Sequence, residues 1–142
     1  MSRLYKALVI DDVRSVRLLV EQKLNDLGVT NVSTAGNGVE ALDVLSREPD
    51  FDVILCDWHM ERMDGLCFCV QLQKLPFIRE RHIPIIFMTC DDRLVEAGKR
   101  QRTLETAKSI GIVEMLVKPF TTDDLQAALA RCSRFEEMKG AS

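Results

Sequence analysis

The sequence has no long apolar run, no excess of basic residues and no paired cysteine motif. No apolar run approaches the ~20 residues needed to cross a bilayer, and the first ten residues become charged too early for a signal peptide. The net charge of −3 argues against a general nucleic-acid-binding protein. Five cysteines without C-x-x-C spacing indicate a reducing cytoplasm rather than a disulfide framework. We therefore expect a cytoplasmic globular protein whose partners include neither membrane nor nucleic acid.

The chain instead contains a regular alternation of strand-like and helix-like segments. Short apolar runs predict five strands, at 7–10, 31–35, 52–57, 83–89 and 113–118. Helical spacing predicts helices from Val13 to Leu27, over 37–48 and 64–75, within 94–110, and from Thr121 through 132. The predicted buried faces of the first two helices contain Val13, Val16, Val20, Leu24 and Leu27, and then Val39, Leu42 and Leu45. Since parallel strands need crossover helices, this order predicts an α/β domain with helices on both faces of a parallel sheet.

Polar side chains follow these strands at their carboxyl ends. Asp11 and Asp12 follow the first strand, Asp57 ends the third, Thr89 ends the fourth and Lys118 ends the fifth. Each residue alone would be an ordinary helix cap or loop end. In an open parallel sheet, however, ligands bind in the crevice beyond these ends, so we expect the five side chains to meet there. Three carboxylates without a histidine or cysteine cluster favour a hard cation such as Mg²⁺ over zinc.

Four motifs along the chain carry a family resemblance. The stretches VIDD, ILCDWHMERMDG, FMT and VKPF share their order, spacing and strand context with the receiver domain of two-component response regulators, which residues 4–134 resemble. The resemblance implies a flavodoxin-like five-stranded parallel sheet of order 2-1-3-4-5. The tail at 135–142 is too short for an output domain, so 1–142 is expected to be a single, stand-alone receiver, as in chemotaxis-type regulators or phosphorelay shuttles.

The resemblance also implies a phosphoacceptor and a metal site. Asp57 is expected to accept a phosphoryl group from a phosphohistidine on a sensor histidine kinase or a histidine phosphotransfer protein. Asp11, Asp12, Asp57 and the backbone carbonyl of His59 are expected to hold Mg²⁺, for which Mn²⁺ can substitute. Water would later hydrolyse the acyl phosphate, so the protein is not expected to be an enzyme with a separate substrate.

Thr89 and Lys118 are implied to contact the phosphoryl group and to start the conformational response. In the family, Thr89 moves toward the phosphoryl group, and an aromatic side chain three positions before Lys118 fills the space behind it. This chain has Met115 at that position. A flexible methionine can fill the space loosely or can be an ordinary core residue, and both interpretations stay open.

Two other departures from the family pattern lie between the strands. Glu61 stands where the family has proline, which is expected to alter rates without removing a chemical group. Residues 91–110 are longer than the family's corresponding segment and carry Lys99, Arg100 and Arg102. This segment is either a solvated face or part of the 91–134 face, through which a downstream protein target is expected to bind.

Three functions are compatible with these residues. A phosphorylation-dependent binding module is favoured by the complete set of strand-end residues. A pseudo-receiver, which docks partners without phosphorylation, is favoured by Glu61 and Met115 but opposed by that complete set. A phosphohydrolase acting through an aspartyl-phosphate would need a second carboxylate two residues after the nucleophile, where this chain has His59.

Overall fold

The structure is a computed structural model that describes residues 5–48, 50–60, 63, 65–76, 83–90 and 112–132. Strands and helices alternate along the amino-terminal half, as the apolar periodicity predicted. The described elements are β1 (Lys6–Ile10), α1 (Arg14–Asp26), β2 (Asn31–Ala35), α2 (Gly38–Arg47), β3 (Val53–Asp57), α3 (Gly65–Gln73), β4 (Ile85–Thr89), β5 (Ile112–Val117) and α6 (Thr122–Ala130).

The five strands form one parallel sheet in the order β2-β1-β3-β4-β5. This confirms the predicted fold class and strand order. The register aligns the carboxyl ends of the strands, because Ile10 lies opposite both Ala35 and Cys56, and Thr89 lies opposite Val117. The residues that end or follow these strands therefore lie along one edge of the sheet.

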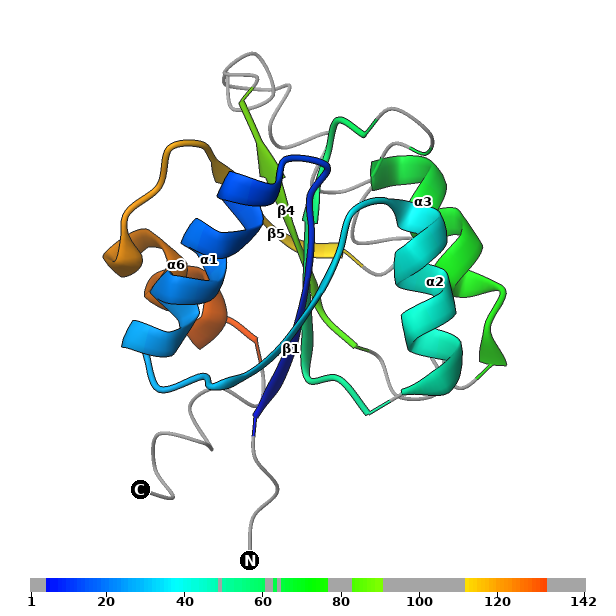
Figure 1. The fold of residues 1–142 in the computed structure, drawn as a ribbon, viewed down its shortest axis with the longest axis horizontal. Coiled ribbons are helices and arrows are strands. Elements are labelled where there is room, and N and C mark those ends of the chain that lie inside the picture. Colours follow the sequence, from blue (N-terminus) through cyan, green and yellow to red (C-terminus); the bar gives the residue numbers. More distant parts are fainter. Residues whose placement is uncertain are drawn as a thin grey trace, which may run out of the picture.

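Helices cover both faces of this sheet (Figure 1). In that view α1 and α6 lie on one side, and α2 and α3 lie on the other. Alternate residues of β1 enter different cores, with Ala7 and Val9 under α1 and α6 and with Leu8 and Ile10 under α2 and α3. Since both faces of the strand are buried, its sequence is a continuous apolar run rather than an alternating one.

The helices differ from their predicted limits and faces at two valines. Helix α1 begins at Arg14 with Val13 as an extended N-cap residue, and the Val13 side chain is 47% exposed. The helical period does not apply to Val13, because that residue lies outside the helix. Val39 is 53% exposed, since the face of α2 turned to the core is the one containing Gly38, Ala41 and Leu45. The predictions that Val13 and Val39 are buried were wrong.

The start of the last helix agrees with its sequence. The Thr121 hydroxyl accepts a hydrogen bond from the Asp124 backbone N–H, and the Asp124 carboxylate accepts one from the Thr121 N–H. This reciprocal capping box supplies acceptors for two N–H groups at the helix start.

Several predictions concern residues outside the described part of the chain. They are the helix within 94–110, the basic residues Lys99, Arg100 and Arg102, the effect of Glu61, and the tail at 135–142. Among the described helices, none is both long enough and apolar enough to span a bilayer.

Candidate functional site

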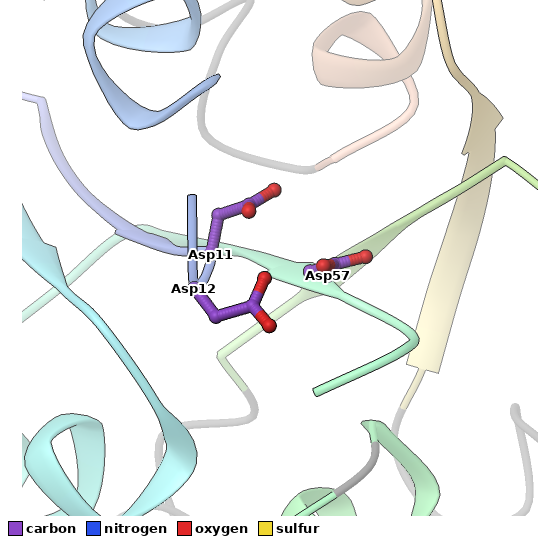
Figure 2. A group of neighbouring side chains, drawn as sticks. All are labelled: Asp11, Asp12 and Asp57. Carbon is purple, nitrogen blue, oxygen red and sulfur yellow. The ribbon is translucent and has the colours of Figure 1, made fainter. Parts of the chain in front are cut away.

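Three aspartates gather at the carboxyl edge of the sheet. Asp11 and Asp12 follow β1, Asp57 is the last residue of β3, and one carboxylate oxygen from each lies within 4.8 Å of the others. Figure 2 shows Asp12 and Asp57 at neighbouring strand ends with Asp11 beside them. Asp11 is fully buried and Asp57 is 6% exposed, whereas Asp12 is exposed to solvent. The cluster is therefore mostly buried and reaches solvent at Asp12.

Asp11 is fixed by its surroundings on every side. Its carboxylate accepts hydrogen bonds from the Val13 N–H at 2.9 Å and from the Lys118 ammonium at 2.6 Å. Its backbone N–H donates to the Ala35 carbonyl in β2, at 3.2 Å. Charge-assisted hydrogen bonds of this kind are stronger than neutral ones, so Asp11 has little freedom to turn. Asp11 does not cap helix α1, whose N-cap residue Val13 makes no side-chain cap.

Among the described residues, Lys118 is the only one whose charged group contacts a carboxylate of the acidic cluster. Its Nζ lies 2.6 Å from Asp11 Oδ2 and 3.4 Å from Asp57 Oδ1. Its backbone N–H donates to the carbonyl of Thr89 at 2.7 Å, which fixes the end of β5 to the end of β4. Burial alone would lower the pKa of the Lys118 ammonium, but the hydrogen bond and the charge of Asp11, with the charge of Asp57, raise that pKa above its ordinary value.

At Asp57, unlike at Lys118, the effect of burial on the pKa outweighs the effect of the nearby opposite charge. Burial raises the pKa of its carboxyl group above the ordinary value, and the nearby charge of Asp11 raises it further. The charge of Lys118 and the N–H of His59, which donates to Asp57 Oδ1 at 3.4 Å, lower that pKa but do not reverse the net shift. One lysine therefore does not neutralise this cluster of carboxylates.

The remaining predicted residues surround the cluster in different ways. Thr89 is fully buried at the end of β4. His59 has an exposed side chain, so the part of this residue turned to Asp57 is its backbone N–H. Met115 is 5% exposed and packs in the core on the α2 and α3 side, opposite Phe87 in the register. The structure thus brings the backbone of His59 to Asp57, joins the backbone of Thr89 to Lys118 and places Met115 in the core.

Trp58, the only tryptophan in the chain, directly follows Asp57 and packs against the core under α2 and α3. Its ring meets Phe87 edge to face, with ring centroids 4.9 Å apart. This contact joins the residue after Asp57 to β4, and it gives the site a fluorophore in a defined apolar environment.

Arg17 is a site residue that the sequence reasoning missed. Its Nη1 donates to the backbone carbonyl of Asp11 at 2.6 Å, from the second turn of α1. The available signal was an arginine one turn into the helix that follows the aspartate pair. Arg17 helps to fix the Asp11 backbone, and with Lys118 it adds positive charge near the carboxylates.

The donor set fits a hard divalent cation. All three ligand candidates are carboxylates, and no histidine nitrogen or cysteine sulfur joins the group among the described residues. The unneutralised negative charge, the convergence of oxygens and the opening at Asp12 together make a cation site more favourable here than an anion site. An anionic group could bind only with a cation present.

Comparisons with known proteins agree with this geometry. The family model for the response regulator receiver domain matches residues 7–130 of this chain. Chemotaxis protein CheY-3 of Vibrio cholerae is 32% identical over 124 residues, covering 87% of this chain and 88% of its own length. Chemotaxis protein CheY1 of Helicobacter pylori is 35% identical over 124 residues, covering 87% of this chain and 93% of its own length.

Solved structures give the same result. Chemotaxis protein CheY4 of Vibrio cholerae, crystallized at low pH, has a TM-score of 0.76 at 30% identity and covers 92% of this chain and 99% of its own. The receiver domain of a sensor histidine kinase from Pseudomonas aeruginosa, with a magnesium ion coordinated in its active site cleft, has a TM-score of 0.73 at 25% identity and covers 92% of this chain and 98% of its own. The chain therefore belongs to the response regulator receiver domain family, among its chemotaxis-regulator-like members.

Proposed function

We propose that this receiver accepts a phosphoryl group on Asp57 from a phosphohistidine, supplied by a sensor histidine kinase or a histidine phosphotransfer protein. The observation that carries the proposal is the arrangement around Asp57. Asp11 and Asp12 place carboxylate oxygens within 4.8 Å of it and of each other, and Lys118 Nζ lies 3.4 Å from its Oδ1. The family's signalling role supports the same reading.

In this proposal Asp11, Asp12 and Asp57 hold Mg²⁺, together with the backbone carbonyl of His59. Mg²⁺ prefers oxygen ligands and commonly retains waters and phosphate oxygens, and Mn²⁺ can take its place. The bound ion supplies positive charge to the oxygens of the phosphoryl group. The receiver domain with magnesium in its cleft supports this assignment by similarity.

The side chains then have separate tasks in the transfer. An Asp57 oxygen forms the new bond to phosphorus as the bond from phosphorus to the histidine nitrogen breaks. Lys118 stabilises the negative charge that accumulates on the phosphoryl oxygens, and the Thr89 hydroxyl donates to the transferred group. Hydrolysis by water later returns Asp57 and inorganic phosphate, so no separate substrate is consumed.

The signal is proposed to pass to a downstream protein through the 91–134 face in the cytoplasm. The described part of that face has a hollow of about 370 Å³ between β5 and α6, lined by Met115, Leu116, Val117, Phe120, Asp124, Ala127 and Arg131. Phosphorylation must favour one of two arrangements of such a face, or no partner can distinguish the two states.

The test uses a small phosphodonor such as acetyl phosphate with Mg²⁺, followed by intact-mass measurement. We expect one phosphoryl adduct in the wild type and none in Asp57→Asn, because the amide keeps the shape but is not an anionic nucleophile. Asp43→Asn, at an exposed carboxylate on α2, is the matched control and should be labelled normally. Labelling that persists in Asp57→Asn contradicts the acceptor assignment. A folded wild type that binds Mg²⁺ but takes no label favours the pseudo-receiver instead.

A further inference from the structure

Gly38, the first residue of helix α2, has a backbone conformation that residues other than glycine can also adopt. Among the described glycines, only Gly28 has a positive φ. A glycine in a helix loses more conformational entropy on folding than alanine does, so one at an ordinary helical position calls for a reason outside the backbone. Gly38 is buried, which directs attention to what packs against it.

The side chain of Met63 occupies the space where a Gly38 side chain would lie. A Cβ built on Gly38 would be 2.8 Å from Met63 Sδ and 3.3 Å from both Cβ and Cγ of Met63. Rotating the end of the methionine can move Sδ away, but the contact with Cβ at 3.3 Å is relieved only if Met63 itself shifts by a few tenths of an ångström. Gly38 is therefore matched to Met63 through close packing.

This contact joins the two segments that carry the acidic cluster. Met63 follows Asp57 by six positions, and Met60 between them is 7% exposed in the same core. Gly38 follows Ala35, whose carbonyl accepts the Asp11 N–H. Packing of Met63 on α2 thus connects the chain after Asp57 with the strand pair that holds Asp11.

We propose that Met63 and Gly38 form a positioning contact, which helps to hold Asp57 at the distance from Asp11 and Asp12 that a divalent cation requires. The inference rests on the metal site of the proposed function and assigns to it two residues that touch neither cation nor phosphoryl group. Like-charged carboxylates push one another apart, so their spacing has to be maintained by packing elsewhere. Partners behind the ligands commonly govern metal affinity in this way.

The experiment titrates Mg²⁺ and follows the emission of Trp58. Gly38→Ala and Met63→Ala are each expected to raise the Mg²⁺ dissociation constant about tenfold. In the double variant the smaller side chain removes the overlap, so Mg²⁺ should bind no more weakly than in Met63→Ala alone, a non-additive result. Met63→Leu, which retains an apolar side chain of similar volume, should bind nearly as the wild type does.

Gly36→Ala is the matched control, two residues before Gly38. A Cβ there would meet the flexible end of Glu40, at 2.8 Å from Oε2, so the neighbour can move aside. Its Mg²⁺ affinity should stay within about twofold of wild type. Urea unfolding without metal, run on every variant, separates a change in affinity from a change in folding.

The outcomes are distinguishable. If Gly38→Ala and Met63→Ala lose stability but bind Mg²⁺ as the wild type does, the contact is ordinary packing and the inference is overturned. Should Gly38→Ala not fold, Met63→Ala and Met63→Leu still decide the question. A wild type that does not bind Mg²⁺ overturns the metal site and this inference together, whereas unchanged variants of a Mg²⁺-binding, phosphorylatable wild type overturn the inference alone.

Discussion

The two ends of the sheet each combine a lysine with several carboxylates, yet they are organised differently. At the amino end, Lys6 Nζ lies 2.8 Å from Asp50 and 3.7 Å from Glu48, and 4.6 Å from the centre of the Phe51 ring. The buried Asp52 accepts the backbone N–H of Lys6 at 2.7 Å, and its own N–H donates to the Lys6 carbonyl at 2.7 Å. Each carboxylate at this end has a partner within the protein.

At the carboxyl end the carboxylates approach one another instead. Lys118 contacts Asp11 and Asp57, while Asp12 stands open to solvent within the same cluster. Among the described residues, a metal-like grouping of carboxylates occurs only at this end. Acidic composition alone therefore does not make a cation site. The deciding feature is that three carboxylates lie within 4.8 Å of one another, with a single lysine in contact with two of them.

The largest effect is expected from Asp12→Ala. Asp12 is the exposed carboxylate of the cluster, and removing it takes away one of three candidate ligands. We expect the Mg²⁺-dependent change in Trp58 emission to be abolished, because Mg²⁺ depends on its few carboxylate ligands. The metal-free variant should be at least as stable as the wild type, since one like charge has been removed.

Asp50→Ala is the control for this comparison, because it removes a carboxylate from the opposite end of the sheet. Its Mg²⁺ titration should match that of the wild type. A normal titration in Asp12→Ala would place the metal elsewhere, and a lost titration in Asp50→Ala would remove the distinction between the two ends.

The second-largest effect is expected on the free energy of unfolding, when the contacts at the amino end of the sheet are removed. Asp52→Ala leaves the N–H of Lys6 without its buried charged acceptor, so the free energy of unfolding should fall by about 2 kcal/mol. Asp50→Ala, which removes a half-exposed partner of the same lysine, should cost less than about 1 kcal/mol. Urea unfolding of both variants measures the difference. Equal losses in the free energy of unfolding would show that the buried hydrogen bond of Asp52 stabilises the protein no more than the exposed ion pair of Asp50 does.

The fold could be predicted from the sequence because its strands and helices have distinct periods. Buried parallel strands are continuous apolar runs, and the order of elements limits how they can pair. The helix faces were less predictable at their ends. Val13 lies outside the helical period, and the buried side of α2 includes the small residues Gly38 and Ala41, which carry little hydrophobic signal.

The members of the candidate site could also be predicted, since a parallel sheet brings its strand ends together. What the sequence could not give was the set of contacts that hold them. The hydrogen bond from Arg17 to the Asp11 carbonyl and the packing of Met63 on Gly38 depend on where α1 and α2 come to lie, which no local pattern specifies. Residue identity indicated the chemistry, and tertiary packing determined the geometry.

The smallest expected effect follows from the raised pKa of Asp57, which burial and then Asp11 produce. In the unfolded chain this carboxyl group titrates near its ordinary pKa of 3.8, whereas the folded protein holds the proton to higher pH. As pH rises between these two values, the unfolded state loses its proton first, so the folded state loses stability relative to it. Asp57 therefore contributes less stability to the metal-free fold at neutral pH than it does in acid.

Asp57→Asn removes this ionisation while keeping the shape of the side chain. Without metal, the variant should be more stable than the wild type at pH 7, by less than the loss expected for Asp52→Ala. The difference should shrink as pH falls toward 3.8, where the wild-type carboxyl group is increasingly protonated in both states. Urea unfolding at several pH values in the presence of a chelator measures it, and adding Mg²⁺ at pH 7 should favour the wild type selectively, because the variant lacks the carboxylate ligand. A variant less stable than the wild type at neutral pH, with the gap narrowing under acid, would mean that Lys118 outweighs burial and Asp11, so that the carboxyl end is as well neutralised as the amino end.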